Sequence, residues 1–235
     1  MNKCALITGA TKGIGKSIAY ALAKEGYHML LAARTESDLL NLQATLQSQY
    51  PNQMIHYRAA DCKDQKQVQA LAQQTDALFP DLDVLVNNVG LFIPGSFLEE
   101  PPEALADHLA VNVLCTHYLS VYFGKKMCQR KSGHLFNLGS VAGKSPFVKA
   151  ASYSVTKYAV HGLTAILRQE LGSYGVKVTE IIPGSTYTAS WEGVDIPPEK
   201  FVAAEDIAQA VISCLSMSKG ANVDEIFIRP LDLNI

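Results

Sequence analysis

A tyrosine and a lysine at helical spacing are the residues whose types could most directly do chemistry. Tyr153 and Lys157 are separated by one helical turn (i to i+4), which places the phenol and the ammonium group on the same face of a helix. A phenol with a pKa of about 10 is a weak proton donor at neutral pH. A cation about 4 Å away contributes up to roughly 4 kcal/mol at an effective dielectric constant near 20. We therefore expect Lys157 to lower the pKa of Tyr153 by as much as about three units, which would suit general acid–base catalysis.

Two further polar residues could complete this site. Ser140 follows the predicted strand His134–Leu138, and the carboxyl ends of parallel strands border the ligand crevice of an α/β sheet. We therefore expect Ser140 to lie beside the helix of Tyr153 rather than in an ordinary turn. Asn112 lies in an apolar helical stretch, where a buried amide needs hydrogen-bond partners. A catalytic water or groups of the core could satisfy it, and the sequence leaves both interpretations open.

A glycine-rich turn near the N-terminus could hold a pyrophosphate. The segment Thr8–Gly15 joins the first predicted strand to the first predicted helix, with its glycines in G-x-x-x-G-x-G spacing. Such glycines let the backbone turn tightly and approach a phosphate at the helix N-terminus. After the second strand comes Arg34, with no carboxylate before Glu36. Arg34, together with Lys12 in the turn, favours a 2′-phosphate and hence NADP(H); the alternative is that both are solvated surface charges.

These residues need a scaffold in which strands and helices alternate. Short apolar runs predict strands covered on both faces at Cys4–Ile7, His28–Ala33, Ile55–Ala60, Val84–Asn87, His134–Leu138, Val176–Ile182 and Glu225–Ile228. Amphipathic stretches predict helices at Gly13–Lys24, Glu36–Gln49, Gln65–Leu78, Glu103–Arg130, Tyr153–Leu171 and Glu205–Ser216. We expect a single doubly wound α/β domain over residues 1–235, with a parallel sheet of about seven strands and helices on both faces.

The composition excludes several other classes of protein. The 235 residues are 48% hydrophobic and 18% charged, with a net charge of −2 and scattered Lys and Arg, so we expect neither disorder nor a nucleic-acid or membrane surface. No apolar run approaches the roughly 18 residues of a membrane span, and the first strand leaves no room for a signal peptide. The 5 cysteines are dispersed and the 6 histidines lack ligand spacing, so we expect reduced thiols, a cytoplasmic location and no metal.

Taken together, these segments resemble the short-chain dehydrogenase/reductase family along the whole chain. The matching segments are the Thr8–Gly15 turn, Asn87-Asn88-Val89-Gly90, Asn112, Ser140, Tyr153-x-x-x-Lys157 and Pro183-Gly184-x-x-x-Thr188. The resemblance implies a Rossmann fold with the strand order 3-2-1-4-5-6-7. It implies that Tyr153 protonates a carbonyl oxygen that Ser140 holds. It also implies that Lys157 binds the nicotinamide ribose and lowers the pKa of Tyr153, and that Asn112 anchors a water of the proton relay.

The resemblance also implies a set of cofactor contacts, and the Lys12 and Arg34 pair resembles the NADPH-preferring subgroup. The implied contacts are Gly9, Thr11, Lys12, Gly13, Ile14, Gly15, Arg34, Thr35, Asp61, Cys62, Asn88, Gly90, Tyr153, Lys157, Pro183, Gly184, Thr186 and Thr188. Two departures stand out. Val89 replaces the usual alanine, and the C-terminus lacks the Asp-Gly-Gly ending of acyl-carrier-protein reductases. The C-terminal sequence looks closer to that of sepiapterin-reductase-like and broad carbonyl-reducing members.

We therefore expect NADPH-linked reduction of a ketone or aldehyde to an alcohol, with Tyr153 as general acid. Leu91–Gly95, Gly143–Val148 and a substrate loop of about 185–203 should close the pocket, which Phe92, Phe147 and Trp191 would make apolar. Alternatives within the family are a 3-oxoacyl-[acyl-carrier-protein] reductase and a hydroxysteroid or sugar-alcohol dehydrogenase. From another class, a non-catalytic NADP(H)-sensing protein is the rival, although such a protein should have lost part of the catalytic set.

The resemblance implies a homodimer or homotetramer as well. Members of the family usually pair two long central helices, and the matching stretches here are Glu103–Arg130 and Tyr153–Leu171. Both stretches are rich in apolar residues. The partners that we expect are therefore a small carbonyl or alcohol substrate and further copies of the chain.

Overall fold

The expected parallel sheet is present in the structure, a computed structural model that describes residues 3–188 and 196–232. The strands form one seven-stranded sheet in the order β3-β2-β1-β4-β5-β6-β7, which confirms the predicted order. Each predicted strand agrees with the observed one to within about a residue at either end. The observed strands are β1 (Cys4–Thr8), β2 (His28–Ala33), β3 (Ile55–Ala59), β4 (Val84–Asn87), β5 (His134–Leu138), β6 (Lys177–Pro183) and β7 (Glu225–Ile228).

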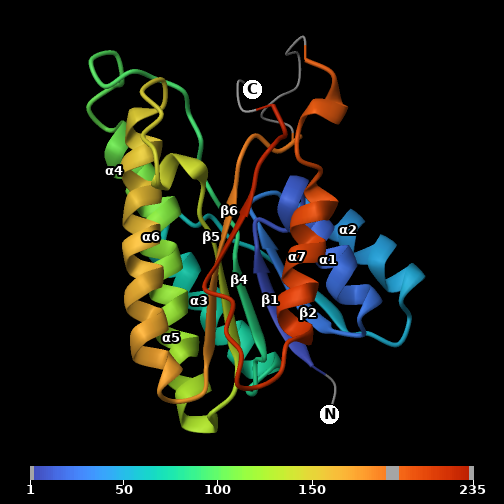
Figure 1. The fold of residues 1–235 in the computed structure, drawn as a ribbon. Helices are drawn as coiled ribbons and strands as arrows, with labels where there is room; N and C mark the ends of the chain where they lie inside the picture. Colours follow the sequence, from blue (N-terminus) through green and yellow to red (C-terminus); the bar gives the residue numbers. More distant parts are fainter. Residues whose placement is uncertain (1–2, 189–195, 233–235) are drawn as a thin grey trace.

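Helices cover both faces of the sheet, as Figure 1 shows. One face is covered by α1 (Gly13–Lys24), α2 (Glu36–Gln49) and α7 (Ala204–Ser216), and the other by α3 (Gln65–Leu78), α5 (Cys115–Arg130) and α6 (Ala151–Gly172), with the short α4 (Ala104–His108) at the end of that layer. The buried apolar side chains accordingly form two clusters, one on each face. Among the described residues, no helix is both long enough and apolar enough to cross a membrane.

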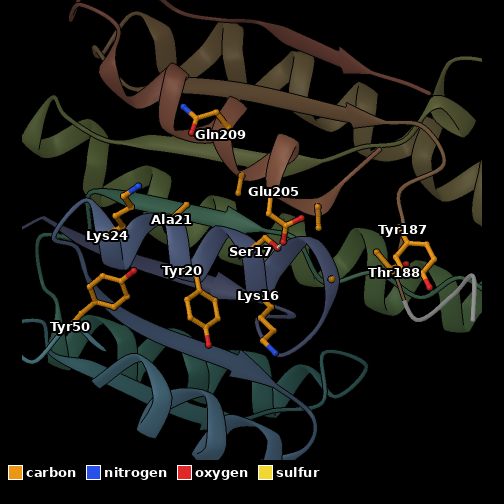
Figure 2. Close-up of a pocket in the computed structure, with 13 residues that line it drawn as sticks. Lys16, Ser17, Tyr20, Ala21, Lys24, Tyr50, Tyr187, Thr188, Glu205 and Gln209 are labelled. Atoms are coloured by element: carbon orange, nitrogen blue, oxygen red, sulfur yellow. Dashed lines mark hydrogen bonds between the residues drawn. The ribbon is translucent and has the colours of Figure 1, made fainter. Parts of the chain in front are cut away.

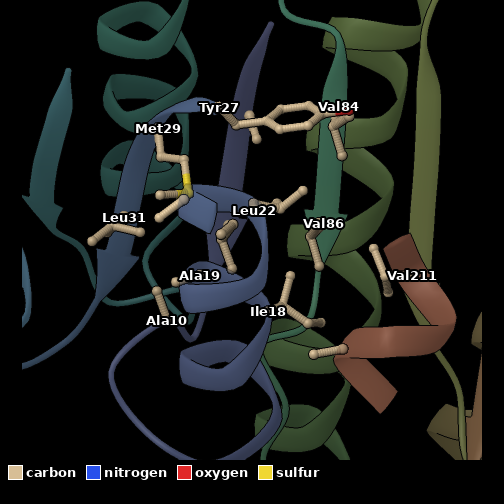
Figure 3. Packing of buried hydrophobic residues seen from close by; sticks show 14 of the residues in the cluster. Ala10, Ile18, Ala19, Leu22, Tyr27, Met29, Leu31, Val84, Val86 and Val211 are labelled. Carbon is tan, nitrogen blue, oxygen red and sulfur yellow. The ribbon is translucent and has the colours of Figure 1, made fainter. Parts of the chain in front are cut away.

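Close packing fixes helix α1 against the sheet. Ile18 and Leu22 of α1 are fully buried in the same apolar cluster as Val86 of β4 and Leu31 of β2 (Figure 3). Val211 of the neighbouring helix α7 packs into the same cluster. Because α1 is held in this way, the glycine-rich turn at its N-terminus is held at the carboxyl end of β1.

The long helix predicted over Glu103–Arg130 is not continuous α-helix. It consists of α4, a π-helical segment (Leu109–Leu114) and α5. Asn112 lies in the π-helical segment and is buried. Apolar periodicity does not reveal a single wide turn, and such turns occur frequently at functional sites. The departure from regular helix therefore coincides with a residue that the sequence analysis had singled out.

Candidate active site

Tyr153, Lys157 and Ser140 meet where β5 ends and α6 begins. The Lys157 Nζ atom lies 5.5 Å from the centroid of the Tyr153 ring, so the two side chains share one face of α6 as predicted. Ser140 precedes a short 3₁₀ turn, and its Oγ accepts a hydrogen bond from Ala142 N at 3.1 Å. The Ser140 side chain is also hydrogen-bonded to Tyr153. The structure thus brings together an acidic hydroxyl, a second hydroxyl and a cation.

The ammonium group of Lys157 is buried and directed at the backbone. Its side chain is 4% exposed, and Nζ donates a hydrogen bond to the Leu138 carbonyl oxygen at 2.6 Å. Burial lowers the pKa of Lys157 from 10.5 to about 8, and the Glu180 carboxylate opposes that shift. The lysine is therefore still mostly protonated at neutral pH.

The expectation that Lys157 lowers the pKa of Tyr153 is wrong for this structure. Burial raises the pKa of the Tyr153 phenol above its ordinary value of 10.0, and the hydrogen bond with Ser140 lowers it only in part. The physical reason is that desolvation disfavours the phenolate, and the opposing hydrogen bond with Ser140 is the weaker of the two effects. Tyr153 therefore carries its proton at neutral pH.

The Asn112 side chain links the loop after β4 to helix α6. Its Oδ1 accepts from Leu91 N at 2.6 Å, and its Nδ2 donates to Leu91 O at 3.0 Å and to Thr156 Oγ1 at 2.9 Å. Protein groups thus engage both ends of the amide, as in the core interpretation. That Asn112 anchors a water stays a prediction.

A pocket of about 420 Å³ runs along the glycine-rich turn beside these residues. The predicted cofactor contacts that line it are Gly9, Thr11, Lys12, Gly13, Ile14, Arg34, Thr35, Asp61, Cys62, Asn88, Gly90 and Thr188. Gly90 connects the pocket to the catalytic residues, because a Cβ at this position would lie 4.0 Å from Lys157 Nζ. A long ligand in the pocket would therefore reach the catalytic lysine.

The backbone of the turn fits a dinucleotide. Gly9 and Gly13 have φ angles of +65° and +49°, in the left-handed region that favours glycine. A Cβ on Gly15 would collide with the Gly9 carbonyl oxygen, so the turn closes only with glycine there. The exposed cations Lys12 and Arg34 line the same pocket. This combination of close backbone approach and positive charge suits phosphate groups.

The remaining predicted contacts lie outside the residues that line this pocket. Gly15 is buried in the turn itself, and Pro183 ends β6. Gly184 and Thr186 belong to the segment after β6, in which the Thr186 hydroxyl donates to Gly184 O at 3.0 Å. This segment leads back to the glycine-rich turn, because Thr188 packs against Gly13.

Several further residues line the pocket. Val89 and Leu91 belong to segments that the sequence had already indicated, whereas Ala33, Asp38, Ala60 and Val111 were not predicted. Asp38 matters most, because it is a carboxylate that lines the same pocket as Arg34. Its position four residues after Arg34, in the first turn of α2, could have indicated this.

An aromatic ring packs against Tyr153, and a second phenylalanine lies in the loop before α6. The ring of Phe92 packs edge to face against Tyr153, with 5.0 Å between the ring centroids. The backbone N–H of Phe147 donates to Ser154 Oγ at 2.9 Å, which ties the loop before α6 to the helix. Both phenylalanine side chains are partly exposed. Trp191 lies outside the described residues.

The two described arms of the predicted substrate loop are joined at their base. Tyr187 N donates to Val202 O at 2.9 Å and Val202 N donates to Ser185 O at 3.0 Å. A second pocket, of about 630 Å³, lies between α1 and α7 near this base (Figure 2). Lys16 and Tyr20 of α1 and Gln209 of α7 line it, whereas Tyr153, Lys157 and Ser140 do not. Although this pocket is larger, the smaller one contains the phosphate-binding features and leads to Lys157.

Comparisons with known proteins agree with this geometry. Residues 3–196 match the model of a family described as short chain dehydrogenase. The chain is 34% identical over 230 residues to an uncharacterized oxidoreductase of Staphylococcus saprophyticus, covering 98% of each protein.

Two solved structures share the fold with this chain. An alcohol dehydrogenase from Thermococcus sibiricus, complexed with 5-hydroxy-NADP, has a TM-score of 0.89 and 27% identity, with 98% of this chain and 97% of that one covered. L-sorbose reductase from Gluconobacter frateurii, complexed with NADPH and L-sorbose, has a TM-score of 0.89 and 25% identity, with 97% and 95% covered.

Proposed function

Because the chain belongs to the short-chain dehydrogenase family of oxidoreductases, we propose that it is an NADPH-dependent reductase of ketones or aldehydes. The observation that carries the proposal is the protonated Tyr153, hydrogen-bonded to Ser140 and facing the buried ammonium group of Lys157. Gly90 lines a pocket whose backbone and charges suit a dinucleotide, and it lies close to the Lys157 Nζ atom.

The proposed chemistry assigns one role to each side chain. When bound, NADPH supplies the hydride for the carbonyl carbon. Tyr153 donates its proton to the carbonyl oxygen, and Ser140 holds that oxygen by a hydrogen bond. Lys157 stabilises the developing negative charge and contacts the cofactor ribose. Because an alkoxide is a far stronger base than a phenolate, the raised pKa of Tyr153 still permits the transfer and keeps the acid form populated, which favours reduction.

The proposed cofactor is NADP(H) rather than NAD(H). Arg34 and Lys12 supply two cations to the pocket, and Arg34 can bind a phosphate through two hydrogen bonds. The solved dehydrogenase and reductase similar to this chain are complexed with 5-hydroxy-NADP and NADPH, which supports the same choice. The predicted contacts outside the pocket, among them Gly184 and Thr186, belong to this proposal as well.

The proposed substrate is a flat or hydrophobic carbonyl compound, as in sepiapterin-reductase-like or broad carbonyl reductases. The support is the ring of Phe92 against Tyr153 and the exposed ring of Phe147 nearby in the chain. An acyl-carrier-protein substrate and a hydroxysteroid remain alternatives within the family. The structural similarity to L-sorbose reductase favours a sugar as a second candidate.

A substrate panel tests this proposal. The purified protein is mixed with NADPH and a series of activated diketones, aromatic aldehydes and ketoses, and the absorbance of the reduced nicotinamide is followed. We expect oxidation of NADPH, fastest with the apolar carbonyls, and a slower reverse reaction with the corresponding alcohols and NADP⁺. Binding of NADPH without oxidation across the panel would favour the non-catalytic sensor instead.

We also propose that the protein is a homodimer or homotetramer that pairs the helical layer of α5 and α6. Exposed apolar side chains on this layer support the pairing, among them Leu114 and Ile166, which are 62% and 63% exposed. Light scattering should give two or four times the chain mass of 25.5 kDa. A mass that stays at one chain over a wide concentration range would contradict this proposal.

A further inference from the structure

A chain of charged side chains runs from the surface to the interior beside the catalytic lysine. The Lys144 ammonium group lies 2.9 Å from Glu225 Oε2 and 3.0 Å from His161 Nε2. The other ring nitrogen of His161, Nδ1, lies 2.8 Å from Glu180 Oε2. His161 comes one helical turn after Lys157 on α6, so the chain ends next to the proposed active site.

The hydrogen bonds define the charge on each member of this chain. An ammonium group can only donate, so His161 Nε2 must accept from Lys144 and the ring hydrogen must be on Nδ1, where it is donated to Glu180. With its hydrogen on Nδ1, the ring adds no positive charge beside Glu180. Glu225 neutralises Lys144 at the outer end. Glu180 is thus a carboxylate with no cation hydrogen-bonded to it among the groups of this chain.

Glu180 is buried directly below the loop that carries Ser140. Its side chain is 1% exposed, and a Cβ on Gly139 would collide with the carboxylate. Burial of a carboxylate is unfavourable unless a nearby positive charge compensates it. Lys157 is buried as well, and its Nζ atom donates to the carbonyl oxygen of Leu138, the residue that precedes Gly139. The Glu180 carboxylate and the Lys157 ammonium group therefore approach consecutive residues at the end of β5, and Glu180 opposes the effect of burial on the pKa of Lys157.

We propose that Glu180, fixed by His161, is a positioning residue whose negative charge keeps Lys157 in its ammonium form inside the active site. The inference rests on the proposed function of Lys157, because it explains how a buried lysine stays charged during the reaction. Lys144 and Glu225 hold His161 from outside and make no contact with Lys157 themselves.

A metal ion is the other possible occupant of this cluster. The ligand atoms of His161, Glu180 and Glu225 lie within 4.8 Å of one another, a spacing that could hold a cation. The Lys144 Nζ atom already lies within hydrogen-bond distance of both His161 and Glu225. The ammonium group thus supplies the positive charge that a metal would bring.

The decisive variant is Glu180→Gln, which keeps the shape and can still accept from His161 but removes the charge. The titration of Lys157 is followed by NMR of ¹³C-lysine-labelled protein, with the resonance assigned from a Lys157→Arg variant. We expect a midpoint near 8 in the parent protein. In Glu180→Gln the midpoint should fall by about one pH unit, the lower end of the effect of a nearby opposite charge.

The pH profile of carbonyl reduction gives a second measurement. The alkaline limb of kcat/KM should move down with the Lys157 midpoint, so that activity at pH 9 falls about tenfold in Glu180→Gln. Glu225→Gln is the matched control, since it removes the same charge from the outer end and should leave both the midpoint and the limb unchanged. Glu180→Asp restores the charge and should restore the limb.

Each outcome has a defined meaning. An unchanged Lys157 midpoint in Glu180→Gln, or an equal shift in Glu225→Gln, would overturn the role of Glu180. If Glu180→Gln does not fold, His161→Asn is measured instead, because it removes the ring that fixes the carboxylate. The Lys157 midpoint should fall in this variant too. An unchanged midpoint in His161→Asn would also overturn the role of Glu180. A parent protein without turnover would refute the proposed function, while the NMR titration would still decide the inference about Glu180.

Discussion

Replacing Tyr153 by phenylalanine is expected to lower kcat for carbonyl reduction by about 10²- to 10⁴-fold, the usual contribution of a positioned general acid. The substitution removes the only proton that the proposed mechanism delivers to the carbonyl oxygen. The ring and its edge-to-face contact with Phe92 remain, so the fold and the shape of the site should persist. The affinity for NADPH, measured by fluorescence titration, should stay close to that of the parent protein.

A second tyrosine on the same helix provides the control. Tyr158 is 43% exposed and lies one residue beyond Lys157, so Tyr158→Phe removes a hydroxyl from α6 without touching the proposed site. We expect this variant to keep the parent kcat. If Tyr153→Phe retains activity within tenfold of the parent protein, Tyr153 is not the proton donor.

Replacing Arg34 by aspartate is expected to shift the cofactor preference from NADPH towards NADH. A charge-assisted hydrogen bond contributes about 1.5–3 kcal/mol, so losing even one to a 2′-phosphate should weaken NADPH binding by at least about 10-fold. The new carboxylate repels a phosphate but can accept a hydrogen bond from a ribose hydroxyl. The ratio of kcat/KM for the two cofactors, with one carbonyl substrate, measures the change.

Removing the carboxylate of Asp38 changes the charge of the same pocket in the opposite direction. Asp38→Asn removes a carboxylate that lines the pocket alongside Arg34, so the preference for NADPH should rise rather than fall. Opposite shifts in the two variants would locate the 2′-phosphate near α2. If neither variant changes the cofactor ratio, the phosphate binds elsewhere and the charge argument for NADP(H) is wrong.

The scaffold could be predicted from the sequence, and so could the candidate residues of the site. Continuous apolar runs such as Met29–Ala33 fit strands covered on both faces, and the observed strand order agrees with the predicted one. The i to i+4 spacing of Tyr153 and Lys157 placed both on one face because helix geometry is local. Most of the cofactor contacts drawn from the family resemblance line one pocket in the structure.

The hydrogen-bond partners and the electrostatic surroundings of these residues depend on contacts between distant segments. The pKa of Tyr153 is raised rather than lowered, because the phenol is buried in the assembled fold. The π-helical turn at Asn112 is tied to contacts of its side chain with Leu91 and Thr156. Glu180 and His161 come into contact because β6, which carries Glu180, packs against α6, which carries His161. Local sequence patterns specify backbone conformation, whereas desolvation and hydrogen bonding between distant segments are properties of the assembled fold.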